Sequence, residues 1–153
     1  MPKAPNKPLL IARFALAAIF CFTAIFQVKA QEVEVSPEGF ETFTMQTSDT
    51  SWIMKKYYFC MLVRGNQADS LSREELMVIQ RGHMAHLEQL GKDGKICIAG
   101  PFDGGEDWRG LVVFNVPSIE EATRLAQADP AVQAGRLEAR IVPWWAGVGS
   151  RLE

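Results

Sequence analysis

The sequence predicts an α+β protein with the ferredoxin-like element order β-α-β-β-α-β, built around one four-stranded antiparallel sheet. Two segments have the apolar spacing of amphipathic helices, and each begins at a serine followed three residues later by a glutamate. Four short runs of strand-forming residues, bounded by Gly, Pro or Asn, flank these helices within about 90 residues. The chain of 153 residues has room for one such domain.

The first strand is followed by the longer of the two helices. Residues 57–63 (YYFCMLV) form a short apolar run that stops at Arg64, which is typical of a buried strand. Ser72 and Glu75 predict a capping box, in which each side chain accepts a hydrogen bond from the backbone N–H of the other residue. Gly91 predicts the end of this helix. Its apolar stripe consists of Leu76, Ile79, His83, Leu87 and Leu90.

The second half of the chain supplies three strands and a second helix. The helix begins at Ser118, whose capping-box partner is Glu121. It ends before Pro130, because the residue before a proline avoids the helical conformation. Residues 131–135 are expected to form a turn or a short helical piece. The three strands are expected at residues 95–100, 110–116 and 137–143.

This element order places strands one and three side by side in the middle of the sheet, with strand two outside strand three and strand four outside strand one. Right-handed crossovers place both helices on one face. The opposite face would expose apolar side chains such as Tyr57, Phe59 and Val63. Soluble monomers rarely leave so large an apolar area uncovered. We therefore expect a second copy to pack on this face, giving a two-fold homodimer.

Residues 1–30 have the three parts of a secretory signal peptide. Two lysines precede residue 8, an uncharged apolar run covers residues 14–26, and Val28 and Ala30 stand three and one residues before Gln31. We expect cleavage after Ala30 and an exported protein, periplasmic or secreted, without stable membrane insertion. An uncleaved anchor is the alternative, but a membrane span needs about 20 apolar residues and this run has 13.

The remainder of the chain divides into an extended N-terminal lead-in at residues 31–51, one domain at residues 52–147 and a short tail at residues 148–153. Residues 1–30 hold four of the 16 Lys and Arg and none of the 18 Asp and Glu, so the remainder has 12 basic against 18 acidic residues, or −6. We expect no nucleic-acid partner, because neutralising phosphate supplies most of the non-specific affinity for nucleic acid.

Two cysteines, Cys60 and Cys97, would remain after cleavage. They fall on strands one and two, and strand three lies between these two strands in the predicted sheet. Neighbouring strands lie about 4.8 Å apart, so this separation exceeds the limit of about 7 Å between the Cα atoms of a disulfide. We expect two buried free thiols.

His83 is the strongest candidate for chemistry. It lies on the apolar stripe of the first helix and should point towards the sheet, where an imidazole needs a hydrogen bond. Gly82 is unfavourable inside a helix by about 1 kcal/mol relative to alanine, so a ligand or a neighbouring element is expected to approach closely there. A core histidine with satisfied hydrogen bonds, beside a packing glycine, is the other explanation.

Asp129 is the expected partner of His83. It follows the second helix, and the dipole disfavours a carboxylate at a helix C-terminus unless a group such as a protonated histidine compensates. The two helices share one face of the sheet, so Asp129 could orient the imidazole of His83 as a general base and fix its tautomer.

The other candidate residues have weaker signals. His86 could share a metal with His83, but no third ligand is in view, so we expect no metal site. Pro101 and Phe102 close the second strand and Trp144 follows the fourth, so these residues could line a substrate pocket or contact a dimer partner. No glycine-rich phosphate loop or dinucleotide fingerprint occurs, and we expect no cofactor.

The order of several short motifs between Tyr57 and Trp145 resembles the YciI-like (YCII-related) family. The motifs are His83-x-x-x-Leu87-x-x-Leu90, Ala99-Gly100-Pro101, Glu121-Ala122, Asp129-Pro130 and Pro143-Trp144. The resemblance implies a dimeric α+β barrel and a site made of a helix histidine and the aspartate of the Asp-Pro pair, which correspond to His83 and Asp129. Typical members begin almost at the first strand, whereas this chain has a signal peptide and a lead-in.

Two functions follow as hypotheses. The first is a small cofactor-independent enzyme of the lyase, isomerase or hydrolase type, in which His83 and Asp129 act on a small cyclic or aromatic compound. The second is a non-catalytic binding or structural dimer module of the cell envelope, in which His83 is a core residue. A cavity open to solvent, with His83 and Asp129 in contact, favours the enzyme.

Overall fold

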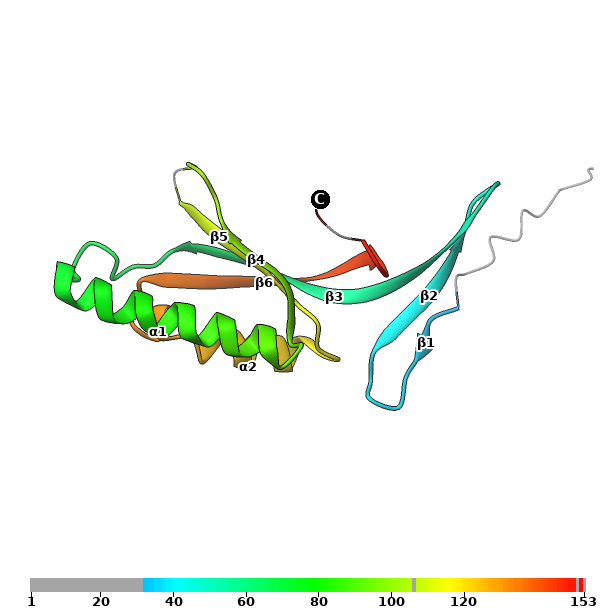
Figure 1. Ribbon diagram of the computed structural model, residues 1–153, viewed down its shortest axis with the longest axis horizontal. Coiled ribbons are helices and arrows are strands. Elements are labelled where there is room, and N and C mark those ends of the chain that lie inside the picture. Colours follow the sequence, from blue (N-terminus) through cyan, green and yellow to red (C-terminus); the bar gives the residue numbers. More distant parts are fainter. Residues whose placement is uncertain (1–31, 106, 151, 153) are drawn as a thin grey trace, which may run out of the picture.

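The computed structural model describes the chain except residues 1–31, 106, 151 and 153, so the predicted signal peptide lies outside the described residues. The described residues form one antiparallel sheet of six strands, with the helices on one of its faces (Figure 1). None of the described helices has the length and apolarity needed to cross a membrane. In chain order the elements are β1 (Glu34–Val35), β2 (Glu41–Gln46), β3 (Ser51–Arg64), α1 (Arg73–Lys92), β4 (Ile96–Pro101), β5 (Trp108–Phe114), α2 (Ile119–Gln127), α3 (Pro130–Gln133) and β6 (Leu137–Gly147).

The predicted ferredoxin-like arrangement is confirmed. β3 and β5 are neighbours in the middle of the sheet, β4 lies outside β5, and β6 lies outside β3. β3, β4, β5 and β6 are the four strands predicted from the sequence, in the predicted spatial order. α1 and α2 lie along the same face of these strands (Figure 1). The second copy required for a dimeric barrel stays a prediction.

The expectation of four strands was incomplete, because the predicted lead-in contains β1 and β2. β2 pairs with the first part of β3, where Thr42 stands opposite Lys55 and Gln46 opposite Ser51. Lys55 also pairs with Ala146 of β6, so β2 lies along the edge of β3 that β5 occupies further on. β3 is therefore longer than the predicted strand, and the β1–β2 hairpin extends beyond the helices (Figure 1).

Serine caps begin both long helices, but only one forms the complete capping box. At α1, the Ser72 hydroxyl accepts from Glu75 N–H at 3.3 Å, and the Glu75 carboxylate accepts from Ser72 N–H at 2.7 Å. At α2, Ser118 accepts from Glu121 N–H at 3.2 Å. The Glu121 carboxylate instead accepts from Lys95 Nζ at 2.7 Å, so the second predicted box is half formed.

The core lies between the helices and the sheet, and Cys60 belongs to it. Cys60 is fully buried on the helix-facing side of β3, and burial raises the pKa of its thiol to about 12. Cys97 is exposed, which corrects the prediction of two buried thiols. Cys97 lies on an edge strand and shares a pocket with Tyr57 and Trp144, on the sheet face away from the helices, which explains its exposure. Both thiols are free, as predicted.

The sheet face opposite the helices carries exposed apolar side chains. Tyr57 and Phe59 of β3 stand opposite Trp144 and Val142 of β6 on this face. The exposed fractions of Val142 and Trp144 are 54% and 42%. Val63, which was expected to be exposed with them, is buried at 3%. The end of the chain borders this face, where Ser150 and Leu152 line a pocket together with Tyr57 and Trp144.

Candidate functional site

The structure brings His83 and Asp129 into direct contact. His83 Nδ1 lies 2.6 Å from Asp129 Oδ2, and the two residues are 8% and 3% exposed. A carboxylate at this distance accepts a proton that Nδ1 carries, so the neutral imidazole has its free lone pair on Nε2. The pairing predicted from the two helices is therefore present, and it fixes one tautomer.

Asp129 does not lie at the C-terminus of the second helix in the way the sequence suggested. α2 ends at Gln127, and Asp129 is the N-cap of the short helix α3. Its second oxygen, Oδ1, accepts from Ala131 N–H at 2.8 Å. Both carboxylate oxygens are thus satisfied in a buried place, one by the backbone of α3 and one by His83 of α1.

Gly82 allows α1 and α3 to come this close. A Cβ atom at residue 82 would stand 3.0 Å from Cγ and 3.2 Å from Cβ of Pro130. The glycine beside His83 therefore serves the approach of a neighbouring element, which was one of the two reasons considered for it. Pro130 is the first residue of α3, directly after Asp129.

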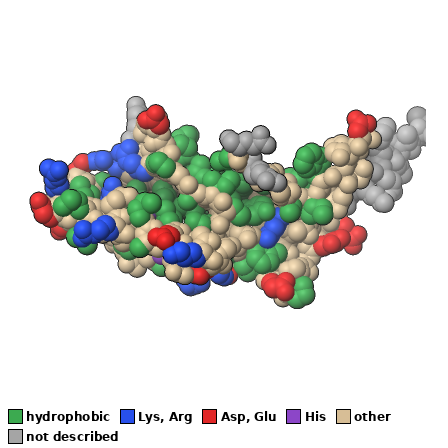
Figure 2. Space-filling model, in the orientation of Figure 1, with side chains coloured by type: hydrophobic (Ala, Val, Ile, Leu, Met, Phe, Trp, Pro, Cys, Tyr) green, Lys and Arg blue, Asp and Glu red, His purple; other side chains and the backbone are tan. Residues whose placement is uncertain are grey.

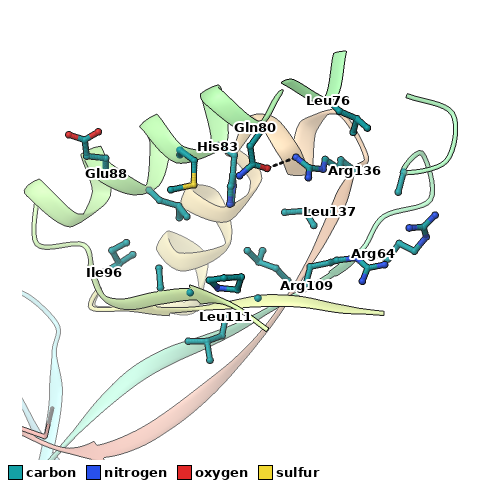
Figure 3. Close-up of a pocket in the computed structure, with 18 residues that line it drawn as sticks. Arg64, Leu76, Gln80, His83, Glu88, Ile96, Arg109, Leu111, Arg136 and Leu137 are labelled. Carbon is teal, nitrogen blue, oxygen red and sulfur yellow. Dashed lines mark hydrogen bonds between the residues drawn. The ribbon is translucent and has the colours of Figure 1, made fainter. Parts of the chain in front are cut away.

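A cavity of about 950 Å³ opens between α1 and the sheet, and the His83 ring points into it (Figure 3). Nε2 of His83 has no hydrogen-bond partner among the described residues. Since no fully buried side-chain nitrogen or oxygen of these residues lacks a partner, Nε2 is not fully buried. His83 lines the cavity, so Nε2 is open to it. The cavity is lined by Leu62, Arg64, Ala68, Leu76, Gln80, His83, Met84, Leu87, Glu88, Ile96, Ala99, Gly100, Pro101, Arg109, Gly110, Leu111, Arg136 and Leu137.

Three arginines of this lining were not identified from the sequence. Arg64 ends β3, Arg109 lies near the start of β5, and Arg136 directly precedes β6. Because β3 runs antiparallel to β5 and β6, the end of β3 and the starts of the other two lie at the same end of the sheet. That rule of topology, applied to the predicted strand ends, could have found them.

The three residues proposed to bind substrate lie in different places. Pro101 lines the cavity. Phe102 packs against Trp108, with 5.8 Å between the ring centroids, and is not part of the lining. Trp144 lies on the open face of the sheet, with its ring 6.4 Å from Tyr57 and 6.2 Å from Phe59, so the structure separates it from His83.

His86 joins α1 to α2. Its Nε2 lies 3.0 Å from the carbonyl oxygen of Leu125 and donates to it. In the part of the chain that is described, no three His, Cys, Asp or Glu side chains converge as metal ligands would. His86 therefore has a structural contact that needs no metal.

Comparisons with known proteins agree on one family. The family model described as a YCII-related domain matches residues 57–146, which is more than half of the chain. The uncharacterised protein YjpA of Bacillus subtilis (strain 168) is 33% identical over 63 residues, 41% of this chain and 72% of YjpA. Both findings support the family resemblance predicted from the motifs.

A solved structure shows a more distant likeness. It is the 5-chloro-2-hydroxyhydroquinone dehydrochlorinase of Burkholderia phenoliruptrix AC1100 in complex with 2,5-dihydroxybenzoquinone. The likeness has a TM-score of 0.41 and 21% sequence identity, and it covers 56% of this chain and 92% of the dehydrochlorinase. It is too weak to carry an inference about the chemistry of this chain.

The approach of α3 to Gly82 leads to a testable prediction. Gly82→Val places its branched side chain against Pro130, and overpacking of this kind costs about 1–3 kcal/mol. Gly91→Val, in the same helix, is the matched control, because apart from the helix backbone nothing lies within 4 Å of its Cβ position. We expect urea unfolding to give a free energy of unfolding at least about 1 kcal/mol lower for Gly82→Val than for Gly91→Val. Equal stabilities would contradict the close approach.

Proposed function

We propose that this chain, which belongs to the family of YCII-related domains, is a small cofactor-independent enzyme that moves a proton on a small cyclic or aromatic compound. The observation that carries the proposal is the different surroundings of the two ring nitrogens of His83. Nδ1 of His83 is held by Asp129 at 2.6 Å, while Nε2 is open to a cavity of about 950 Å³. An imidazole placed in this way has the arrangement that general acid–base catalysis needs.

The proposed step uses His83 as the base. Nε2 takes a proton from an acidic C–H bond of the bound compound, and the electron pair of that bond stays on the substrate. The resulting imidazolium keeps its Nδ1–H bond to Asp129, whose negative charge stabilises it. Return of the proton to another carbon completes an isomerisation, and expulsion of a leaving group by the electron pair completes an elimination. Asp129 is a positioning residue, since it acts through His83.

A non-catalytic binding module is the second candidate, and one observation favours it. Asp129 caps α3 with one oxygen and binds His83 of α1 with the other, so the pair also fastens α1 to α3. A structural role of this kind explains the buried Nδ1 contact. It leaves the opening of Nε2 to the cavity unexplained, which is why we prefer the enzyme.

Hydrogen–deuterium exchange tests the proposal without knowledge of the final product. In D₂O, the wild-type protein should catalyse the exchange of hydrogen for deuterium at the carbons next to the carbonyl of small cyclic ketones. Proton NMR measures this exchange as the loss of the C–H signals of the ketone. General-base catalysis contributes about 10²- to 10⁴-fold, so His83→Gln should slow the exchange by about 100-fold or more. Asp129→Asn can retain the cap of α3 and should slow it by about tenfold or more.

His86→Gln is the matched control for this experiment, because it makes the same substitution three residues along the same helix and its contact is Leu125, outside the cavity. It should leave the exchange rate unchanged. Equal rates for wild type and His83→Gln would rule out the proposed base. Binding of ketones in the cavity with no His83-dependent exchange would favour the binding module.

We also propose that the protein is a homodimer, with the open face of the sheet covered by a second copy. Exposed Val142 and Trp144 on this face, beside half-buried Tyr57 and Phe59, support the pairing of two like apolar surfaces. A two-fold arrangement would bring the same side chains together across the axis.

Light scattering after gel filtration tests the dimer. The wild type should have twice the mass of one chain, and Val142→Glu should have the mass of one chain, because it buries a charge in the interface. Val78→Glu, at an exposed valine of α1, is the matched control and should leave the mass unchanged. A wild type with the mass of one chain would exclude the homodimer.

Export is a further proposal, which rests on residues 1–30. When the full chain is produced in a Gram-negative bacterium, we expect periplasmic protein whose N-terminal sequence begins at Gln31. Ala30→Phe should prevent cleavage, because the site requires a small residue there, whereas Ala24→Phe in the apolar run should not. Wild-type protein that keeps residues 1–30 would exclude the signal peptide.

A further inference from the structure

We propose that the cavity binds a small organic anion, with its negative group held by Arg64, Arg109 and Arg136 and its apolar body further along α1. The inference rests on the proposed function, because it names the substrate class of the same cavity. Figure 3 shows these arginines at one end of the cavity, next to Leu137, with His83 further along α1.

An irregularity in the sheet puts Arg109 in this place. The pairing of β3 with β5 shifts between Leu62 and Val63, so Leu62 stands opposite Gly110 while Val63 stands opposite Trp108. Arg109 is therefore the extra residue of a β-bulge. Bulges turn a side chain out of the regular alternation of a strand, and Arg109 is one of the residues that line the cavity.

Arg136 is placed by α1. Its Nη1 donates to Oε1 of Gln80 at 2.5 Å, and Gln80 precedes His83 by three residues on the helix. A helix rises about 1.5 Å per residue, so Gln80 and His83 differ by about 4.5 Å along the axis of α1. One guanidinium is thus held about one helical turn from the proposed base.

Two of the three arginines at this end of the cavity form no ion pair with a described residue. Arg64 forms an ion pair with Asp69, which is exposed, and Glu88 of the lining is paired with Lys92 at 2.6 Å. No carboxylate of the described residues forms an ion pair with Arg109 or Arg136, which are both half-buried. Figure 2 shows Lys and Arg side chains gathered at the end of the molecule where β3 ends and α1 begins. Guanidinium groups partly withdrawn from water favour a bidentate anion such as a carboxylate.

Apart from Gln80, His83 and Glu88, the rest of the lining is apolar, so we expect an amphipathic ligand. Ile96 lies beyond His83, on the side away from the arginines (Figure 3), and Met84 and Leu87, which follow His83 on α1, also line the cavity. His83 then faces the junction between the anionic group and the apolar body.

Calorimetric titration of the purified protein tests the inference with three acids and their neutral amides: benzoate, phenylacetate and 2-naphthoate against benzamide, phenylacetamide and 2-naphthamide. At least one acid should bind about tenfold or more tightly than its amide, since hydrogen bonds between a guanidinium group and a carboxylate contribute on that scale. Arg109→Gln should lower this ratio to about threefold or less, and Arg136→Gln should lower it in the same direction. Arg124→Gln, at an exposed arginine of α2, is the matched control and should leave the ratio unchanged.

Three results would overturn the inference: none of the acids binds, the amides bind as well as the acids, or the ratio survives both Arg109→Gln and Arg136→Gln. His83→Gln separates the inference from the proposed function, because it should keep the acid-to-amide ratio while it removes proton exchange. Selective binding of acids without His83-dependent exchange would therefore contradict the function alone. Exchange on ketones without acid selectivity would contradict only this inference.

Discussion

A buried carboxylate is the constraint on which the arrangement of the site depends. Asp129 is 3% exposed, and an ionised group in such a place must have hydrogen-bond donors. The donors come from two elements, the backbone of α3 and the imidazole of His83 on α1. α1 and α3 must therefore meet, and the lack of a side chain at Gly82 permits this. With Nδ1 committed to Asp129, the other nitrogen of His83 is directed at the cavity.

Local signals were sufficient to predict most of the fold. Ser72 and Ser118 predict the starts of the two long helices, because an N-cap motif occupies only four consecutive residues. The spatial order of the four strands then follows from the order of the elements along the chain. The β1–β2 hairpin was missed because its stability comes from distant partners. β2 pairs with the start of β3, and Phe43 packs edge-on against Trp145, 4.8 Å away, from the other end of the chain. Residues 41–46 alone show little of this.

The site could be predicted only in part, for similar reasons. His83 was identified because a polar residue interrupts a helical stripe. Asp129 was identified from its position after the second helix and from the family resemblance, but its place at the start of α3 was not predicted. Arg109 directly precedes a predicted strand, but the register shift that makes it the extra residue of a bulge became visible only in the folded sheet. Trp144 was assigned to the pocket although the alternation of β6, opposite Tyr57, places it on the other face. Pairing register decides such questions, and register is a property of the folded sheet.

The length of β3 separates two parts of the molecule. Its first residues pair with β2 of the hairpin, and its last residue, Arg64, lines the cavity. A strand of 14 residues spans about 45 Å, at about 3.3 Å per residue. Energetic effects at such distant positions normally add without coupling. We therefore expect a change in the length of the hairpin to have little effect on the candidate site. The fold is in this sense modular along a single strand, so that sequence variation in the hairpin need not alter the candidate site at the other end.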